Sequence, residues 1–331
     1  MPLSNEANFG VRPLTDAINN LPVTPTTIRE SGLFVPEYLT TTYVDVESKG
    51  NQLTLVQSAP RGTPGKPVAE SREGKKTFQC VHLPKDDVVR ADDVQNVRAF
   101  GSENTAAAVN DKVNDKLAGM KSDLEYTREH LQLGALQGKV LDADGTVIVD
   151  FNKEFNITRP NLALGLSNDT TKAGSVLDKF LRERKKALAG DTFKGWLVYA
   201  SPEWLEAFIY HKSIYDLYAR FSDSAKVYTQ DNSNTEVAFR YRNVDIVEYD
   251  YQFGSEVDIK TGEALLAPVG TKKTLKEYFA PADMNATVNT KAFPYYASRE
   301  KLSHDKGWSL HAQTNPLPVA LRPLALATLK I

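Results

Sequence analysis

The residue types that can carry chemistry occur in this chain without the spacing that catalysis or metal binding requires. Zinc proteases place two histidines four residues apart on a helix, whereas Arg128-Glu129-His130 lacks the first of them. No histidine belongs to a paired metal-ligand motif. We interpret each as a surface residue or as a core residue with satisfied hydrogen bonds: His82, His130, His211, His304 and His311.

Two short motifs match only part of known ligand-binding loops. Residues 142–145 (Asp-Ala-Asp-Gly) begin like a calcium loop, but one acidic position and the terminal glutamate are missing, which favours a hairpin turn. Residues 62–66 (Gly-Thr-Pro-Gly-Lys) contain a fragment of a phosphate loop, but the nearby prolines and the absent leading glycine favour a turn. The Gly-x-Ser-x-Gly and Gly-x-Gly-x-x-Gly motifs do not occur. We therefore expect no cofactor, no metal and no enzymatic activity, with a soluble hydrolase as a distant alternative.

Composition indicates a folded and soluble chain. Its 331 residues are 41% hydrophobic and 25% charged, which suggests roughly two domains of ~150 residues each. No apolar run approaches the ~20 residues needed to cross a bilayer, and residues 1–8 lack the regions of a signal peptide. We expect a chain made in the cytoplasm, with no membrane partner. The single cysteine, Cys80, excludes an intrachain disulfide, and we interpret it as a small half-buried hydrophobe at a strand end.

Charge is nearly balanced overall but uneven along the chain. The formal net charge of -2 argues against a dedicated nucleic-acid binder, because phosphate neutralisation needs clustered lysine and arginine. Basic residues gather between positions 48 and 76: Lys49, Arg61, Lys66, Arg72, Lys75 and Lys76. A group of aspartates follows: Asp86, Asp87, Asp92 and Asp93. The two groups are candidates for contacts between chains.

A long helix is predicted over residues 104–137. Its apolar stripe recurs at three- and four-residue steps: Ala106, Val109, Val113, Leu117, Met120, Leu124, Thr127, Leu131 and Ala135. Ser122 with Glu125 has the form of a capping box, which would begin a helix there. Because the stripe keeps its phase through Gly119 and Ser122, we prefer one bent helix of about 50 Å. Gly119 would mark the bend, since glycine weakens a helix by about 1 kcal/mol relative to alanine.

A hairpin is predicted directly after this helix. Gly138 can adopt the positive φ that often follows a last helical turn. Val140 and Leu141 would then pair with residues 147–149 across Asp144-Gly145, because Asp-Gly between apolar runs is a strong hairpin signal.

Short segments in a fixed order along nearly the whole chain carry a family resemblance. They are residues 40–42, 53–61, 96–101, 127–129, 135–140, 142–147, 278–283, 288–290, 313–318 and 322–323. Together they resemble the lambda-type (E) major capsid protein family of tailed double-stranded DNA bacteriophages. Residues 161–258 match only as a pattern of helices and strands.

The resemblance implies an α+β fold of the Hong Kong ninety-seven type. It divides the chain into segments: an N-terminal arm (1–41), an extended β-hairpin loop (42–82), a peripheral domain with a long spine helix and β-hairpin (83–166), an axial domain (167–272) and a return to the peripheral domain (273–331). In this family the extended loop lies across a neighbouring subunit, and a loop of the axial domain points toward the centre of a capsomer.

The extended loop has its own sequence signals. Residues 43–46 and 77–81 are typical of strands, and residues 49–51 (Lys-Gly-Asn) of a turn. Such a ribbon has too few apolar residues to build a core, so we expect it to project. Its basic residues could dock on the aspartates of a neighbour, either residues 86–93 or Asp111, Asp115 and Asp123. The alternative is a solvated flexible loop whose charges face water.

The remaining segments give simpler predictions. Residues 176–188 and 202–209 are predicted helices, the second with proline at its start, and residues 196–199, 237–241, 244–249 and 264–269 are predicted strands. Residues 222–235 are predicted to form a loop. The proline-interrupted tail, 308–331, should return to the peripheral sheet at an edge. Residues 1–32 show little periodicity, so we expect an arm that a neighbouring subunit holds in place.

The function implied by the resemblance is self-assembly into pentamers and hexamers of an icosahedral virion shell around double-stranded DNA. Expected partners are other copies of the chain, portal, scaffolding, and decoration or head-completion proteins. Packaged DNA would be a weak lumenal contact, which a nearly neutral surface suits. An encapsulin-like nanocompartment shell protein is the alternative. An intersubunit isopeptide bond from Lys49 or Lys66 would need an asparagine and a glutamate that the sequence does not select. The helix bend would change as the shell expands.

Overall fold

The computed structural model describes residues 11–21, 26–48, 74–94, 105–220, 237–249, 251–254 and 256–331. The chain forms two compact units, each built from separated stretches. The first comprises Met1–Tyr43, Gln79–Gln132 and Glu277–Val319, and the second comprises Val44–Phe78, Leu133–Lys276 and Ala320–Ile331. These two units combine stretches that lie far apart in the sequence. The five segments implied by the family resemblance stay a prediction.

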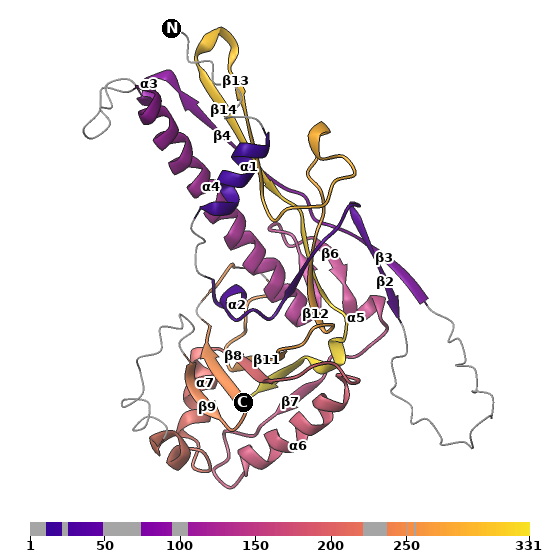
Figure 1. The fold of residues 1–331 in the computed structure, drawn as a ribbon. Coiled ribbons are helices and arrows are strands. Elements are labelled where there is room, and N and C mark those ends of the chain that lie inside the picture. The colour runs from indigo at the N-terminus through magenta and orange to yellow at the C-terminus, as the bar shows by residue number, and fades with distance from the viewer. Residues whose placement is uncertain are drawn as a thin grey trace, which may run out of the picture. The chain divides into compact units, whose positions relative to one another are not determined.

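The first unit is built on an antiparallel sheet with the order β13-β14-β4 (Figure 1). Its strands are β13 (Tyr296–Lys301), β14 (Gly307–Thr314) and β4 (Leu83–Arg90). Helices α1 (Val11–Asn20) and α4 (Thr105–Gln137) pack on one face. The shared core is apolar and buried: Leu14, Ile18, Val89, Val113, Leu117, Met120, Leu124, Tyr295, Ala297, Leu310 and Ala312. Short helices α2 (Thr27–Glu30) and α3 (Ala91–Val94) flank these elements in the sequence.

Helix α1 corrects the prediction that residues 1–32 lack helical periodicity. Leu14 and Ile18 lie one turn apart and are both buried in the core of the first unit. The side chain of Asn19 donates to the Tyr295 carbonyl at 2.9 Å, which fixes the end of the helix. The chain's own fold therefore holds residues 11–20, and no neighbouring subunit is needed to explain their order.

Helix α4 confirms the prediction of one long helix. The described apolar positions of the stripe are buried, except Thr127, which is half-buried. Ser122 lies inside the helix rather than at its start, so the capping-box interpretation is wrong. The helix ends as predicted at Gly138, which has a φ of +88°. The hairpin also forms: β5 (Lys139–Leu141) pairs with β6 (Val147–Asp150).

Gly119 gives a first testable prediction. It lies on the exposed side of α4, and a Cβ added there would meet no atom within 4 Å. We expect Gly119→Ala to raise the free energy of unfolding by about 0.5–1 kcal/mol, because alanine loses less backbone entropy in a helix. Urea denaturation of the unassembled chain measures this change. A lowered midpoint would show that the helix needs glycine at this position.

The second unit contains a mixed sheet with the order β7-β16-β11-β8-β10-β9. Its strands are β7 (Asn161–Ala163), β16 (Ala327–Lys330), β11 (Glu263–Val269), β8 (Gly195–Ala200), β10 (Val244–Glu248) and β9 (Val237–Tyr241). Alternate residues of β8, namely Trp196, Val198 and Ala200, join one core with helices α6 (Ala173–Lys186) and α7 (Pro202–Tyr210). The helices and strands predicted in this region are confirmed. The predicted loop at 222–235 lies outside the described residues.

Helix α7 begins as its sequence predicts. Pro202 occupies the first turn, where a missing N–H costs nothing, and the Ser201 hydroxyl accepts a hydrogen bond from the Trp204 N–H at 3.3 Å. Three basic residues end α6, where they face the negative end of the helix dipole: Arg184, Lys185 and Lys186.

The tail differs in part from its prediction. Strand β15 (Pro316–Ala320) lies at the edge of a small sheet with the order β1-β12-β15, completed by β1 (Val35–Tyr38) and β12 (Leu275–Phe279). Strand β16, in contrast, lies between β7 and β11 in the second unit. Its apolar residues Ala327 and Leu329 are fully buried there, so the expected return to one sheet is wrong for this strand. Three short 3-10 helices complete the region: Asn285–Thr287, Ser303–Asp305 and Pro323–Ala325.

Candidate functional site

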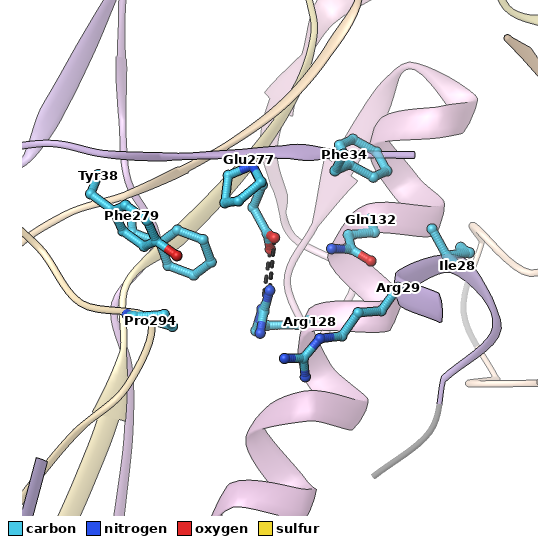
Figure 2. A pocket seen from close by; sticks show the side chains of 10 residues that line it. Ile28, Arg29, Phe34, Tyr38, Arg128, Gln132, Glu277, Phe279 and Pro294 are labelled. Atoms are coloured by element: carbon cyan, nitrogen blue, oxygen red, sulfur yellow. Dashed lines mark hydrogen bonds and ion pairs between the residues drawn. The ribbon is translucent and has the colours of Figure 1, made fainter. Parts of the chain in front are cut away.

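A group of charged side chains lies buried along helix α4 in the first unit. Arg128 donates two hydrogen bonds to Glu277 on β12, at 3.1 and 2.7 Å (Figure 2). Its guanidinium also donates to the Tyr295 hydroxyl and stacks over the Phe279 ring, 5.0 Å from the ring centre. Only 5% of Arg128 is exposed. The Arg128–Glu277 pair therefore joins α4 to β12.

The electrostatics of the pair favour its charged form. Burial alone would lower the pKa of Arg128, but the carboxylates of Glu277 and Glu125 raise this pKa well above the ordinary arginine value. A bidentate arginine–carboxylate pair satisfies the donors and acceptors of both groups, which a single buried charge cannot do. Burial likewise raises the pKa of the Tyr295 hydroxyl, so this neighbour stays neutral.

The same face of α4 holds the segment around α2. Glu125 pairs with Arg29 of α2 and with Arg128. Glu129 accepts a hydrogen bond from the Ile28 N–H at 2.9 Å. Glu125 therefore ties two parts of the unit together instead of capping a helix start.

Lys121 adds a fourth charge to this face. It is 2% exposed, donates to the Leu21 carbonyl at 2.8 Å and lies over the Tyr295 ring. Burial lowers the pKa of Lys121. We name Lys121, Glu125, Arg128, Glu129 and Glu277 the α4 charge cluster.

Sequence reasoning missed the α4 charge cluster. Charged residues on a helix usually face water, so only the apolar stripe was assigned to the core. A signal was present, because Lys121, Glu125 and Arg128 follow one another at four- and three-residue steps beside the stripe. The residues that cover this face, such as Leu21 and Glu277, are 100 and 149 positions away from their partners in the sequence, so no local pattern reveals that the face is buried.

The predicted contact aspartates lie on β4 and α3 of the first unit. Asp87 accepts a hydrogen bond from Lys116 at 2.8 Å, and this bond holds the pKa of Asp87 below its usual value. Asp86 pairs with His311 across the sheet at 2.5 Å. Asp92 and Asp93 are exposed, and Asp93 accepts the Arg90 N–H. Asp86 and Asp87 therefore have side-chain partners within the chain, whereas Asp92 and Asp93 are exposed and Asp93 accepts only a backbone N–H among the described contacts.

Of the predicted basic residues, only Lys76 has a described side chain. Lys49, Arg61, Lys66 and Arg72 lie outside the described residues, and only the backbone of Lys75 is described. Lys76 on β3 (Gly74–Gln79) pairs with Glu154 of α5 (Phe151–Glu154) at 3.0 Å and lies over the Phe155 ring. Beside it, Phe78 contacts Phe151 edge-on at 5.8 Å. Since β3 pairs with β2 (Tyr43–Ser48), these contacts anchor the base of the ribbon within the second unit.

Cys80 follows β3, as its predicted place at a strand end requires, and it is buried rather than half-buried. Burial raises the pKa of its thiol to about 12, so the thiol stays protonated at neutral pH. Because the thiolate is the nucleophile, we expect native protein to react with Ellman's reagent at pH 8 far more slowly than protein unfolded in urea. Equal rates in the two states would contradict this burial.

The described residues contain no group of three or more histidine, cysteine, aspartate or glutamate side chains placed to hold a metal ion. The hydrogen bonds and ion pairs among Lys121, Glu125, Arg128, Glu129 and Glu277 and their neighbours assign the α4 charge cluster a structural role.

Comparison with known proteins supplies the deciding observation. The sequence matches the family described as phage major capsid protein E over residues 10–331. The chain belongs to the phage major capsid protein E family. A major capsid protein of Pseudomonas phage KPP10 is 24% identical over 343 residues, which cover 97% of this chain and 96% of that protein. A major capsid protein of Salmonella phage Felix O1 is 22% identical over 361 residues, covering 99% and 97%.

Solved structures show the same fold. The putative capsid protein of a prophage of E. coli CFT073 superposes with a TM-score of 0.57 at 12% identity, covering 97% of this capsid chain and 99% of that one. A phage-related protein from Bordetella bronchiseptica RB50 gives a TM-score of 0.50 at 14% identity, covering 97% of both chains. The α+β fold is therefore that of the Hong Kong ninety-seven type, as the sequence resemblance implied.

Family membership also gives the location, which is the capsid of the virion. Within the part of the chain that the structure describes, no helix has the length and apolar content to span a bilayer.

Proposed function

We propose that this chain is the major head protein of a tailed bacteriophage and assembles into pentamers and hexamers of an icosahedral shell around double-stranded DNA. The observation that carries this proposal is the family match over residues 10–331. The protein would act by assembly rather than catalysis. Portal, scaffolding, and decoration or head-completion proteins would be its partners, and packaged DNA a weak lumenal contact.

The extended loop would make the main contact between neighbouring subunits. Its base is anchored by the Lys76–Glu154 pair and the contact of Phe78 with Phe151, which supports a ribbon of defined direction. The axial region, 167–272, would face the capsomer centre. Several modest contacts per subunit would combine into a stable lattice, because linked contacts strengthen each other through effective concentration.

The basic residues of the loop would dock on the exposed aspartates of a neighbour. Within the group of residues 86–93, Asp92 and Asp93 suit this role best because Asp86 and Asp87 already pair with His311 and Lys116. Of the alternative aspartates on α4, Asp123 pairs with Lys85, whereas Asp111 and Asp115 are exposed. We expect Asp92→Lys combined with Asp93→Lys to lower the yield of assembled particles at low salt without changing subunit stability. Gradient sedimentation measures the yield. A charge reversal at the exposed Glu300 of β13, which lies outside the axial region, is the control, and equal losses in both variants would contradict this docking.

The helix bend remains a prediction. Gly119 would let α4 change its curvature as the shell expands, and Gly119→Ala would then slow expansion while stabilising the subunit. Equal α4 curvature in immature and mature particles would contradict this role.

Size-exclusion chromatography with light scattering tests the proposed function. We expect a species far larger than the 36.7 kDa chain, either alone or with scaffolding protein supplied. A monomer at high concentration under both conditions would contradict the proposal.

A further inference from the structure

A cavity of about 200 Å³ lies beside the α4 charge cluster in the first unit. Figure 2 shows Gln132 with Ile28 and Arg29 on one side of it, and Tyr38, Phe279 and Pro294 on the other. Arg128 and Glu277 also line the cavity. Tyr38 and Phe279 make one side aromatic, whereas the polar Gln132 and Arg29 share the other side with Ile28 and Phe34.

Gln132 contributes a polar atom without a partner to this wall. The residue is 2% exposed, and its Oε1 atom accepts no hydrogen bond from any residue that the structure describes. A buried acceptor left without a donor costs about 1–3 kcal/mol, so folded proteins rarely retain one. Among the described residues, none supplies a donor to this oxygen.

The surrounding charges narrow the choice of donor. Arg128 is paired with Glu277, and Arg29 with Glu125, so neither arginine leaves a charge for an anion to neutralise. A metal cation would need a free carboxylate, whereas the Glu277 carboxylate that lines the cavity is already paired with Arg128. An apolar ligand would leave the Gln132 oxygen unsatisfied.

We propose that this cavity is a hydration site, in which an ordered water molecule donates to Gln132 Oε1. A volume of about 200 Å³ accommodates several water molecules at about 30 Å³ each. Buried waters need two to four polar partners, and Arg29 and Glu277 line the same space as Gln132. The water would complete the polar network that joins α4 to the segment around α2.

A density map of the assembled protein at better than about 2 Å resolution tests the site directly. We expect a water peak about 2.6–3.2 Å from Gln132 Oε1. Empty density around this oxygen, or a side chain of a neighbouring copy within hydrogen-bond distance, would overturn the proposal.

Stability of a Gln132→Met variant gives a second test, because methionine has a similar volume and no strong acceptor. If water bonds the oxygen, the substitution should raise the unfolding equilibrium constant about fivefold, the value of one ordinary hydrogen bond. If the cavity is dry, removing the stranded acceptor should lower that constant, which would overturn the proposal. Gln79→Met, at an exposed glutamine of β3, is the matched control and should leave the constant unchanged.

Discussion

Replacing Arg128 with methionine is expected to lower the free energy of unfolding by about 3–5 kcal/mol. The substitution removes the partner of Glu277 and one partner of Glu125, and both carboxylates remain buried. An uncompensated buried charge is among the most destabilising changes a protein can undergo. Urea denaturation of the unassembled chain measures the loss.

Two further variants separate the buried charge from the loss of a side chain. Arg240→Met removes a bidentate arginine–aspartate pair with Asp245 whose arginine side chain is 57% exposed, and should cost at most about 1 kcal/mol. Arg128→Met combined with Glu277→Leu removes both charges of the buried pair and should recover much of the lost stability. Equal losses for Arg128→Met and Arg240→Met would contradict the account of the α4 charge cluster.

Gly134→Ala is expected to destabilise the chain by about 2–3 kcal/mol, although alanine favours helices. Gly134 lies in α4, and a Cβ added there would be 2.4 Å from the Lys139 carbonyl oxygen. This oxygen belongs to the backbone of β5, so it cannot move without displacing the hairpin. The same denaturation assay measures the effect.

Gly119→Ala is the matched control because it makes the same substitution in the same helix. It should stabilise the chain, since no atom lies within 4 Å of the added Cβ. The two substitutions should therefore shift the denaturation midpoint in opposite directions. A neutral or stabilising Gly134→Ala would show that the helix and hairpin are not packed as described.

The elements predicted correctly are those whose signals are local. Helix α4 follows from an unbroken apolar stripe, its end from Gly138, and the hairpin after it from Asp144-Gly145. Helix α7 follows from Ser201 and Pro202 at its start. Each signal lies within a few residues of the structure that it specifies, so one sequence suffices to find it.

The predictions that failed depended on distant parts of the chain. Among the side chains that the structure describes, α1 has two buried apolar residues, and their partners in the core lie on β4, β13, β14 and α4. Strand β16 belongs to the same predicted tail as β15, but it pairs with β11 and β7 in the second unit. The partner of Arg128 is Glu277, 149 residues away, and no local pattern connects them. The four aspartates were predicted alike as contact candidates, because the sequence could not show that Asp86 and Asp87 pair with His311 and Lys116 while Asp92 and Asp93 are exposed.

Electron microscopy of the purified chain, with scaffolding protein supplied where it is needed, tests the central claim most directly. The account predicts closed icosahedral shells whose reconstruction places this fold in pentamers and hexamers, with the extended loop of each subunit lying on a neighbour. Particles without five- and sixfold capsomers, or a chain that remains monomeric at high concentration, would contradict it.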